Sequence, residues 1–288
     1  MSDLLTGLAG LGLGDLESID IFADPEKEKE KKKKEMEEQG KVAAVLEKDL
    51  IYDKTIICPV CDEKFTSKIT KTGKARLLGM DKDLRPIHEG IDTQKYDVIL
   101  CPHCGYAALT RFFPNITSGQ AKLIRESISK KVHLHEYKDE IYSYEQALER
   151  YKLALVGAVV KRGKNSEKAY ICLKSAWLIR GYIESLEKVE ETPREQLEQL
   201  HALEETNLQN AYKGFIEARQ SEPFPMCGMD EMTVDYLLAA LGVRFKDYET
   251  ASKLVAQILS TSGANARTKD KARELKDEII LALKNNKR

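Results

Sequence analysis

The chain has 288 residues, of which 42% are hydrophobic and 32% charged, and its formal net charge at pH 7 is −1. This length is enough to bury a core in one large domain or two smaller ones. The near-neutral charge argues against a protein that coats nucleic acid, although a local basic patch stays open. Many Lys and Glu with few Gly and Pro favour a mostly helical protein with solvated faces.

The first 44 residues are predicted to form a flexible, charged tail. Residues 4–14 intersperse Leu with Gly, which weakens any helix, and the alternative is a docking peptide that places its leucines in a partner groove. Residues 26–41 interleave Lys with Glu, a pattern typical of a solvated helix or charged linker. Asp3 stands where a secretory leader would be basic, and the longest apolar run, 153–160, is too short to span a bilayer. We therefore expect a cytoplasmic protein with reduced thiols.

Residues 45–116 are predicted to form a small β module. Strand-like segments at 50–57 and 64–69 flank one Cys-x-x-Cys pair, a third lies at 74–80, and a fourth at 95–100 leads into a second pair. Strand, cysteine knuckle and strand is the arrangement of a zinc ribbon, in which the metal replaces a missing core. The 39 residues between the two pairs exceed a minimal ribbon, so we expect an insertion with a turn or exposed loop at 81–90.

The two cysteine pairs predict a tetrahedral metal site with four thiolate ligands, which are Cys58, Cys61, Cys101 and Cys104. Structural zinc is the favoured ion. Rubredoxin-type iron suits the same geometry, and a dithiol redox pair is the third interpretation. Asp62 in the first knuckle and the lack of a dense aromatic core favour zinc over iron. We expect Gly105 to adopt a positive φ, Asp62 to tolerate one, and His103 to point away from the metal.

Residues 117–288 are predicted to be helical. Apolar residues recur at helical spacing in six segments, with Thr192 and Pro193 beginning the third as N-cap and first-turn residue. The segments are 140–160, 166–189, 193–220, 231–244, 248–260 and 266–285. A faint repeat relates residues 156–176 to 238–258, with small residues at 157/239 and 169/251 that would let helices approach closely.

The predicted fold class is therefore α+β and mostly α. A small, rubredoxin-like β zinc ribbon precedes a helical-repeat domain that resembles a tetratricopeptide (TPR) array. An irregular helical bundle is the alternative for the second half, because helix crossings in a bundle also need small residues.

A combination of motifs resembles the bacterial domain-of-unknown-function family 2225 over roughly residues 45–285. It consists of the two cysteine knuckles, Asp81-x-Asp83-x-Arg85-Pro86, Tyr96 and, in a later helix, Ala176-Trp177-x-x-Arg180. His88 stands where an aromatic Tyr is expected. The resemblance implies a bacterial cytosolic protein with a ribbon and helical repeats, and it implies no established activity.

No catalytic constellation is evident in the sequence. Residues 7–14 lack the Lys-Ser/Thr ending of a phosphate-binding loop, and His133 and His135 would lie on different faces of a helix. We therefore expect a non-enzymatic, zinc-binding adaptor whose helical repeats bind a protein or peptide partner. The alternatives are a rubredoxin-like electron-transfer module, an enzyme using Asp81, Asp83 and His88, and a nucleic-acid-binding ribbon. The last would use basic residues on or near the strands, Lys64, Lys68, Lys71, Lys74 and Arg76.

Overall fold

The computed structural model describes residues 46–134, 139–189, 191–263 and 265–285. Residues 46–288 cluster into one compact unit, distinct from residues 1–45. The predicted tail and His135 lie outside the described residues. Both predicted modules fall within the same unit, so the boundary between residues 116 and 117 stays a prediction.

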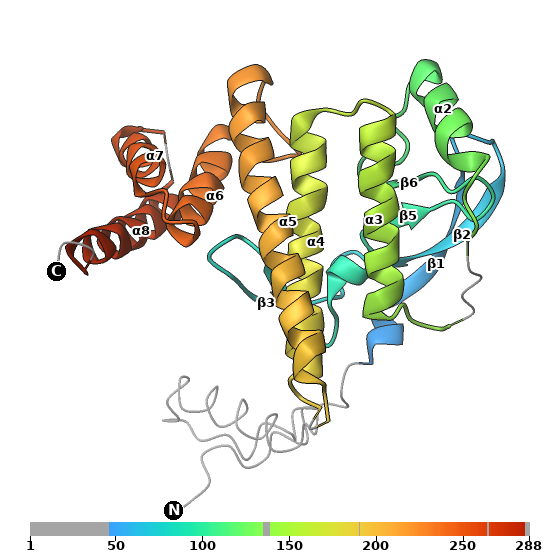
Figure 1. The fold of residues 1–288 in the computed structure, drawn as a ribbon, viewed down its shortest axis with the longest axis horizontal. Coiled ribbons are helices and arrows are strands. Elements are labelled where there is room, and N and C mark those ends of the chain that lie inside the picture. Colours follow the sequence, from blue (N-terminus) through green and yellow to red (C-terminus); the bar gives the residue numbers. More distant parts are fainter. Residues whose placement is uncertain (1–45, 135–138, 190, 264, 286–288) are drawn as a thin grey trace, which may run out of the picture. The chain divides into compact units, whose positions relative to one another are not determined.

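Three antiparallel hairpins form the β part of the described chain (Figure 1). The first and third are each closed by one of the cysteine pairs, and the second lies in the insertion between them. A short 3-10 helix precedes the first hairpin and another precedes the third. The elements are η3 (Glu47–Leu50), β1 (Ile51–Ile57), β2 (Lys64–Thr70), β3 (Leu77–Met80), β4 (Pro86–His88), η4 (Thr93–Tyr96), β5 (Val98–Leu100) and β6 (Ala107–Leu109).

The first two predicted strands are confirmed, because Ile51 pairs with Thr70 at one end of the first hairpin and Ile57 with Lys64 at the other. The other two are shorter than predicted. The segment predicted at 74–80 becomes a strand only from Leu77. The segment predicted at 95–100 begins inside η4, because the Asp92 side chain accepts a hydrogen bond from the Gln94 amide and starts a helical turn there.

Helices make up the rest of the fold and include the six predicted from apolar spacing. The last three have the predicted bounds, and the others differ by four residues or fewer at each end. No described helix is both long and apolar enough to cross a membrane. The helices are α2 (Ser118–Ile124), which continues into the π-helical turn η5 (Arg125–Ser129), α3 (Tyr144–Val160), α4 (Asn165–Leu186), α5 (Arg194–Ser221), α6 (Glu231–Arg244), α7 (Tyr248–Ser260) and α8 (Ala266–Asn285).

The prediction for the start of α5 was wrong. Pro193 occupies the N-cap position itself and contributes no side-chain hydrogen bond. The hydroxyl of Thr192 instead donates to the carbonyl of Leu186 at 2.8 Å, alongside the backbone amide of Val189, so it adds a second hydrogen bond to a carbonyl at the end of α4. Thr192 therefore ends one helix rather than beginning the next.

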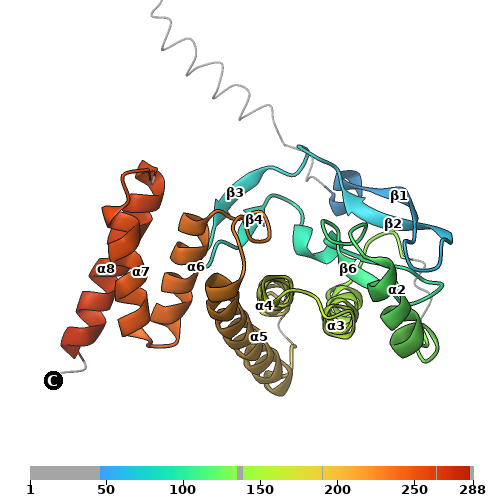
Figure 2. The same ribbon diagram turned by 90° about the horizontal axis from the view of Figure 1, so that it is seen from above.

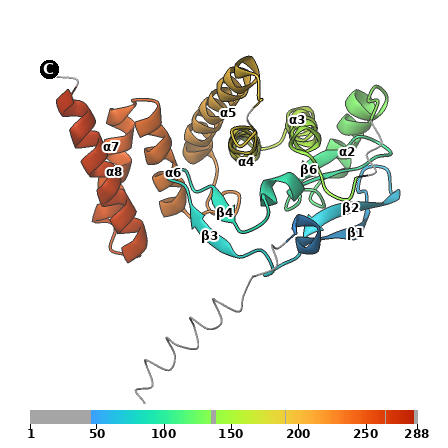
Figure 3. The same ribbon diagram turned by 90° about the horizontal axis from the view of Figure 1, so that it is seen from below.

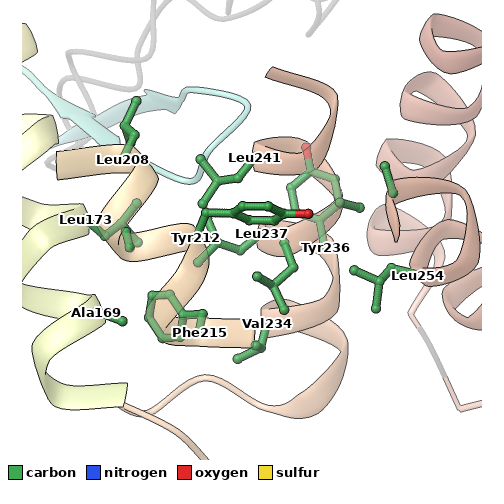
Figure 4. Close-up of a cluster of buried hydrophobic side chains, with 14 of the residues drawn as sticks. Ala169, Leu173, Leu208, Tyr212, Phe215, Val234, Tyr236, Leu237, Leu241 and Leu254 are labelled. Atoms are coloured by element: carbon green, nitrogen blue, oxygen red, sulfur yellow. The ribbon is translucent and has the colours of Figure 1, made fainter. Parts of the chain in front are cut away.

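Helices α3, α4 and α5 pack in sequence, and α3 also packs on β5 and β6 (Figures 2 and 3). Close approach between α4 and α5 depends on Gly214, where a Cβ atom would lie 2.9 Å from the Cβ of Ala169. The largest core cluster joins α4 through α8, with Tyr212, Phe215 and Leu237 among its buried side chains (Figure 4). The helical half therefore has a core that contains none of the paired cysteines.

The faint sequence repeat falls on two helix pairs, α3–α4 and α6–α7. Ala251 meets Gly242 of α6, where an added Cβ would lie 3.2 Å away, so small residues do serve close packing in the second pair. In the first pair the atoms nearest to an added Cβ at Gly157 are the backbone oxygen of Ala107 in β6 and Cδ1 of Ile124 in α2, rather than atoms of α4. The TPR-like geometry therefore stays a prediction.

Candidate metal centre

Each cysteine pair lies in a tight turn that closes a hairpin. In the first turn the amide of Asp62 donates to the carbonyl of Cys58 at 2.9 Å, and in the second the amide of Gly105 donates to the carbonyl of Cys101 at 3.0 Å. Asp62 and Gly105 both have positive φ, 61° and 71°. The two knuckles share one backbone conformation, and both positive-φ predictions are confirmed.

The four thiols of these turns converge on a common point. All four sulfur atoms lie within 4.8 Å of one another. The Sγ atoms of Cys58 and Cys104 are 3.6 Å apart, and those of Cys61 and Cys101 are 3.7 Å apart. A tetrahedral site with zinc–sulfur bonds of about 2.3 Å has sulfur–sulfur edges of about 3.8 Å. The spacing therefore fits a four-thiolate metal site.

Electrostatics also favour a cation at this point. Hydrogen bonds from the thiols of Cys101 and Cys104 lower the pKa of Cys58 to about 2. The same crowding raises the pKa of Cys104, because a second thiolate would face Cys101 and Cys58 across a few ångströms. The thiols alone thus stabilise one negative charge and resist the next, whereas a divalent ion stabilises several thiolates together.

The surroundings close the site and hold its turns in place. Cys58, Cys101 and Cys104 are buried and Cys61 is half-buried. From the α2–η5 segment the guanidinium of Arg125 donates to the carbonyl of Val60 between the first two ligands. Four protein ligands and little exposure are typical of a structural site, which keeps no position for substrate.

An aromatic cluster lies beside the cysteines, so the expectation of a module without a dense aromatic core was wrong. The rings of Tyr106 and Phe113 are 4.8 Å apart, and Phe65 meets Phe113 edge-on at 6.1 Å. All three belong to the buried cluster that contains Cys58, Cys101 and Cys104. This packing removes one of the sequence arguments against iron.

Neither histidine of the module joins the thiols. His103 is exposed, as predicted. His88 is half-buried and its Nδ1 lies 3.3 Å from the hydroxyl of Thr93, where it lines a different cavity. Asp81 and Asp83 do not line that cavity, so it does not gather the three residues of the enzyme alternative.

The two aspartates instead bind Arg180 of α4. Its guanidinium lies 2.8 Å from an oxygen of Asp81, 2.7 Å from one of Asp83 and 2.8 Å from one of Glu204 in α5. Arg85 lies 2.7 Å from the same Asp81 oxygen. These five residues are called the Arg180 cluster below. Both motifs of this cluster are evident in the sequence, but their contact was not predicted. The signal that could have revealed it is their opposite charge, since one motif is acidic and the other contains an arginine.

The basic residues of the nucleic-acid alternative are partly engaged within the protein. Lys68 pairs with Asp53 at 3.2 Å, and the amine of Lys71 donates to a backbone carbonyl. Arg76 lies 3.8 Å from Glu89, and Lys64 and Lys74 are exposed. Internal pairing reduces the charge available to phosphates, but binding to nucleic acid itself stays untested.

Comparison with known proteins yields one match. A family model described as "Uncharacterized protein conserved in bacteria (DUF2225)" matches residues 51–279, a span that holds both cysteine pairs, the three hairpins and the Arg180 cluster. No curated protein and no solved structure matches the chain.

Proposed function

The chain belongs to the bacterial family DUF2225, and from that premise we propose that it is a non-enzymatic adaptor stabilised by structural zinc. One observation carries the proposal. Four cysteine sulfurs from two distant turns lie within 4.8 Å of one another, in a site that is mostly buried. Such a site supplies folding stability and offers no open coordination position for chemistry.

The hairpins give this stabilising role a physical reason. Strand β1 exposes most of its residues, so the first hairpin buries little apolar surface of its own. Ligands from the first and third hairpins bind one ion, which fastens two weak elements to each other. Zinc is the proposed ion because a closed four-thiolate set is its usual structural site, and iron remains the alternative.

The adaptor role concerns the helical half. The aspartates of the insertion are bound by arginines, which leaves them poorly placed as free acid–base groups. The last turns of α8 expose Ile280, Leu281 and Leu283, whose exposed fractions are 41%, 61% and 42%. We propose that a protein or peptide partner covers these side chains with apolar residues of its own.

Metal analysis of the purified full-length protein tests the first part. We expect one zinc ion per chain, and we expect Cys101→Ser to lose it. Cys172→Ser is the matched control, because Cys172 is also buried but lies in the helical core. Iron in the wild-type protein, with a visible absorption band, would overturn the zinc assignment and favour electron transfer.

Cross-linking of the full-length protein in its native cytosol tests the second part. We expect Leu281→Glu to abolish a defined cross-linked partner that the wild type and Lys276→Glu both retain, since Lys276 is an exposed position of the same helix. Equal cross-linking in both variants would show that this end of α8 is not the binding surface.

A further inference from the structure

A second site of interest is a cavity of about 520 Å³ among β1, β2, β4, η4 and α4. Its volume falls in the range of about 300–1,000 Å³ that is typical of small-molecule sites. The lining is mostly polar, with Ile69 and Pro86 as its aliphatic members. A polar cavity of this size favours a hydrophilic ligand.

The inner wall of the cavity contains a fixed ion pair. The Lys174 amine lies 2.6 Å from Oδ2 of Asp97 and donates to Oε1 of Gln94 at 3.3 Å. It also lies over the rings of Tyr170 and Trp177, 5.1 Å and 5.6 Å from their centroids. Lys174 is therefore held from several sides, and it fixes the orientation of Asp97 and Gln94.

Burying these charged and polar groups costs free energy, which points to a role beyond stability. The Lys174 side chain is 12% exposed and Gln94 is 2% exposed, and taking charged and polar groups out of water costs free energy that an apolar contact would not. Burial opposes the charge of Lys174, yet the Asp97 carboxylate raises its pKa above the ordinary value, so the ammonium stays charged at neutral pH. Oriented polar groups that line a cavity are a common feature of binding sites.

The rest of the lining indicates the kind of ligand. Four threonines line the cavity together with Asp97 and Gln94, and hydroxyl, carboxylate and amide groups of this kind suit hydroxyl groups on a ligand. Burial lowers the pKa of His88, which makes it neutral at pH 7. Lys54 is exposed on β1 and forms no ion pair with any residue that the structure describes. The cavity rim thus carries one uncompensated positive charge. The threonines are Thr70, Thr72, Thr93 and Thr110.

We infer that this cavity binds a hydroxyl-rich small molecule with one anionic group, a chemistry shared by sugar phosphates and nucleoside monophosphates. The carboxylate of Asp97 accepts hydrogen bonds from the ligand hydroxyls, the amide nitrogen of Gln94 donates to them, and Lys54 pairs with the anionic group. Lys174 is a positioning residue. The inference goes beyond the adaptor role and does not depend on which metal the cysteines hold.

Calorimetric titration of the full-length protein tests the inference with four probes: ribose 5-phosphate, adenosine 5′-monophosphate, ribose and inorganic phosphate. We expect at least one phosphorylated compound to bind with a Kd below about 1 mM, and both ribose and phosphate to bind at least about tenfold more weakly. The phosphorylated compound that binds more tightly shows whether the natural ligand is a sugar phosphate or a nucleoside monophosphate. Failure of all four to bind would overturn the inference, and so would phosphate binding as tightly as the esters.

Variants locate the binding in this cavity. We expect Lys54→Ala to weaken binding of the phosphorylated ligand about tenfold, because it removes one ion pair. Lys64→Ala, on the same hairpin, should leave the affinity unchanged. Thr93→Val removes a lining hydroxyl at nearly constant volume and should weaken ribose and its phosphate alike. Equal affinities for Lys54→Ala, Lys64→Ala and the wild type would contradict the assignment, and circular dichroism checks that each variant is folded.

Discussion

At the scale of single residues, Gly105 illustrates how closely the two cysteine turns are packed. It has a φ of 71°, which side chains other than Gly rarely adopt, and an added Cβ would lie 2.6 Å from Cγ1 of Val132. Conformation and space therefore restrict this position independently. The cost of the backbone conformation can be separated from the cost of the close contact by comparison with a second glycine.

We predict that Gly105→Ala destabilises the protein by about 3 kcal/mol, from backbone strain and overpacking together. Gly73 has a similar φ of 72° with nothing within 4 Å of an added Cβ, so Gly73→Ala should cost only about 1 kcal/mol. Chemical denaturation measures both. Equal losses would mean that Val132 moves aside and that only the backbone conformation matters.

Asp92 provides a prediction about pH. Burial raises the pKa of its carboxyl, although its oxygens accept hydrogen bonds from the Gln94 amide and the Tyr144 hydroxyl. The folded state then binds a proton more tightly than the unfolded state, so this group's contribution to stability falls as pH rises from about 4 through the folded pKa.

Asp92→Asn should remove that loss while it keeps an acceptor oxygen for the Gln94 amide. We expect the variant to be more stable than the wild type at pH 8, with a difference that shrinks toward pH 4, as measured by urea midpoints across that range. Asp270→Asn, on an exposed stretch of α8, serves as the control and should show no such trend. A pH-independent difference would show that the pKa of Asp92 is the same in the folded and unfolded states.

The residues that could be predicted from the sequence are those whose role is local. Gly105 and Asp62 follow from the requirements of one tight turn, and the exposure of His103 follows from its place between two ligands. The partners of Asp81 and Asp83 could not be found in this way, because Arg180 lies almost a hundred residues later in the chain. Only the packing of the insertion on α4 brings the charges together.

At the scale of elements, the Arg180 cluster fastens the β3–β4 hairpin to α4 and α5. One guanidinium donates to three carboxylates, and its side chain is 18% exposed. Burial opposes the charge, but the hydrogen bonds with Asp83 raise the pKa of Arg180, so it stays charged. The 81–90 segment was predicted to be a turn or exposed loop. It does turn, with the Leu84 amide donating to the Asp81 carbonyl, but it also includes β4 and a buried Asp83.

We predict that Arg180→Met costs about 3–5 kcal/mol, because it leaves three carboxylates without their shared cation. Arg194→Ala removes an exposed pair with Glu198 and should cost less than about 1 kcal/mol. Urea denaturation compares the two. Arg180→Lys should recover little of the loss, since an ammonium cannot contact three carboxylates in the same planar geometry; full recovery would mean that charge alone matters.

The bounds of α6 and α7 were predicted correctly, whereas α3, which Ser143 caps, begins four residues later than predicted. Asp230 and Asp247 each accept a hydrogen bond from a first-turn amide, and the helices they begin, α6 and α7, have the predicted bounds. The strand predicted at 74–80 was too long because it was based on β-type composition, which carries no information on strand pairing. Pairing starts only where Leu77 meets His88. Thr192 was misassigned because the same hydroxyl can serve the end of one helix or the start of the next.

At the scale of the whole molecule, the described chain contains separate apolar clusters. One surrounds three of the paired cysteines, another unites α4 through α8, and a third lies between α3 and the third hairpin. A metal ion held by the four cysteines would contribute directly only to the first. Loss of the metal should therefore destabilise the first cluster more than the other two.

We predict that chelation of the metal exposes the amides of the first and third hairpins and of α2 while those of α5 to α8 stay protected. Stability differs between parts of a fold according to their own contacts, and the helical cluster holds no ligand. Hydrogen exchange followed by mass spectrometry, with and without EDTA, measures this. Simultaneous loss of protection throughout would show that the clusters unfold as one cooperative unit.

The insertion between the knuckles also sets an order of events on the ribosome. The first two thiols emerge on the order of a few seconds before the second two, at synthesis rates of roughly 5–20 residues per second. Until Cys104 follows, Cys58 and Cys61 have no partners with which to enclose an ion, and Asp81 and Asp83 wait longer still for Arg180. The nascent chain therefore passes through a stage with free thiols and unpaired carboxylates, in which we expect oxidation or binding of another metal to compete with correct folding.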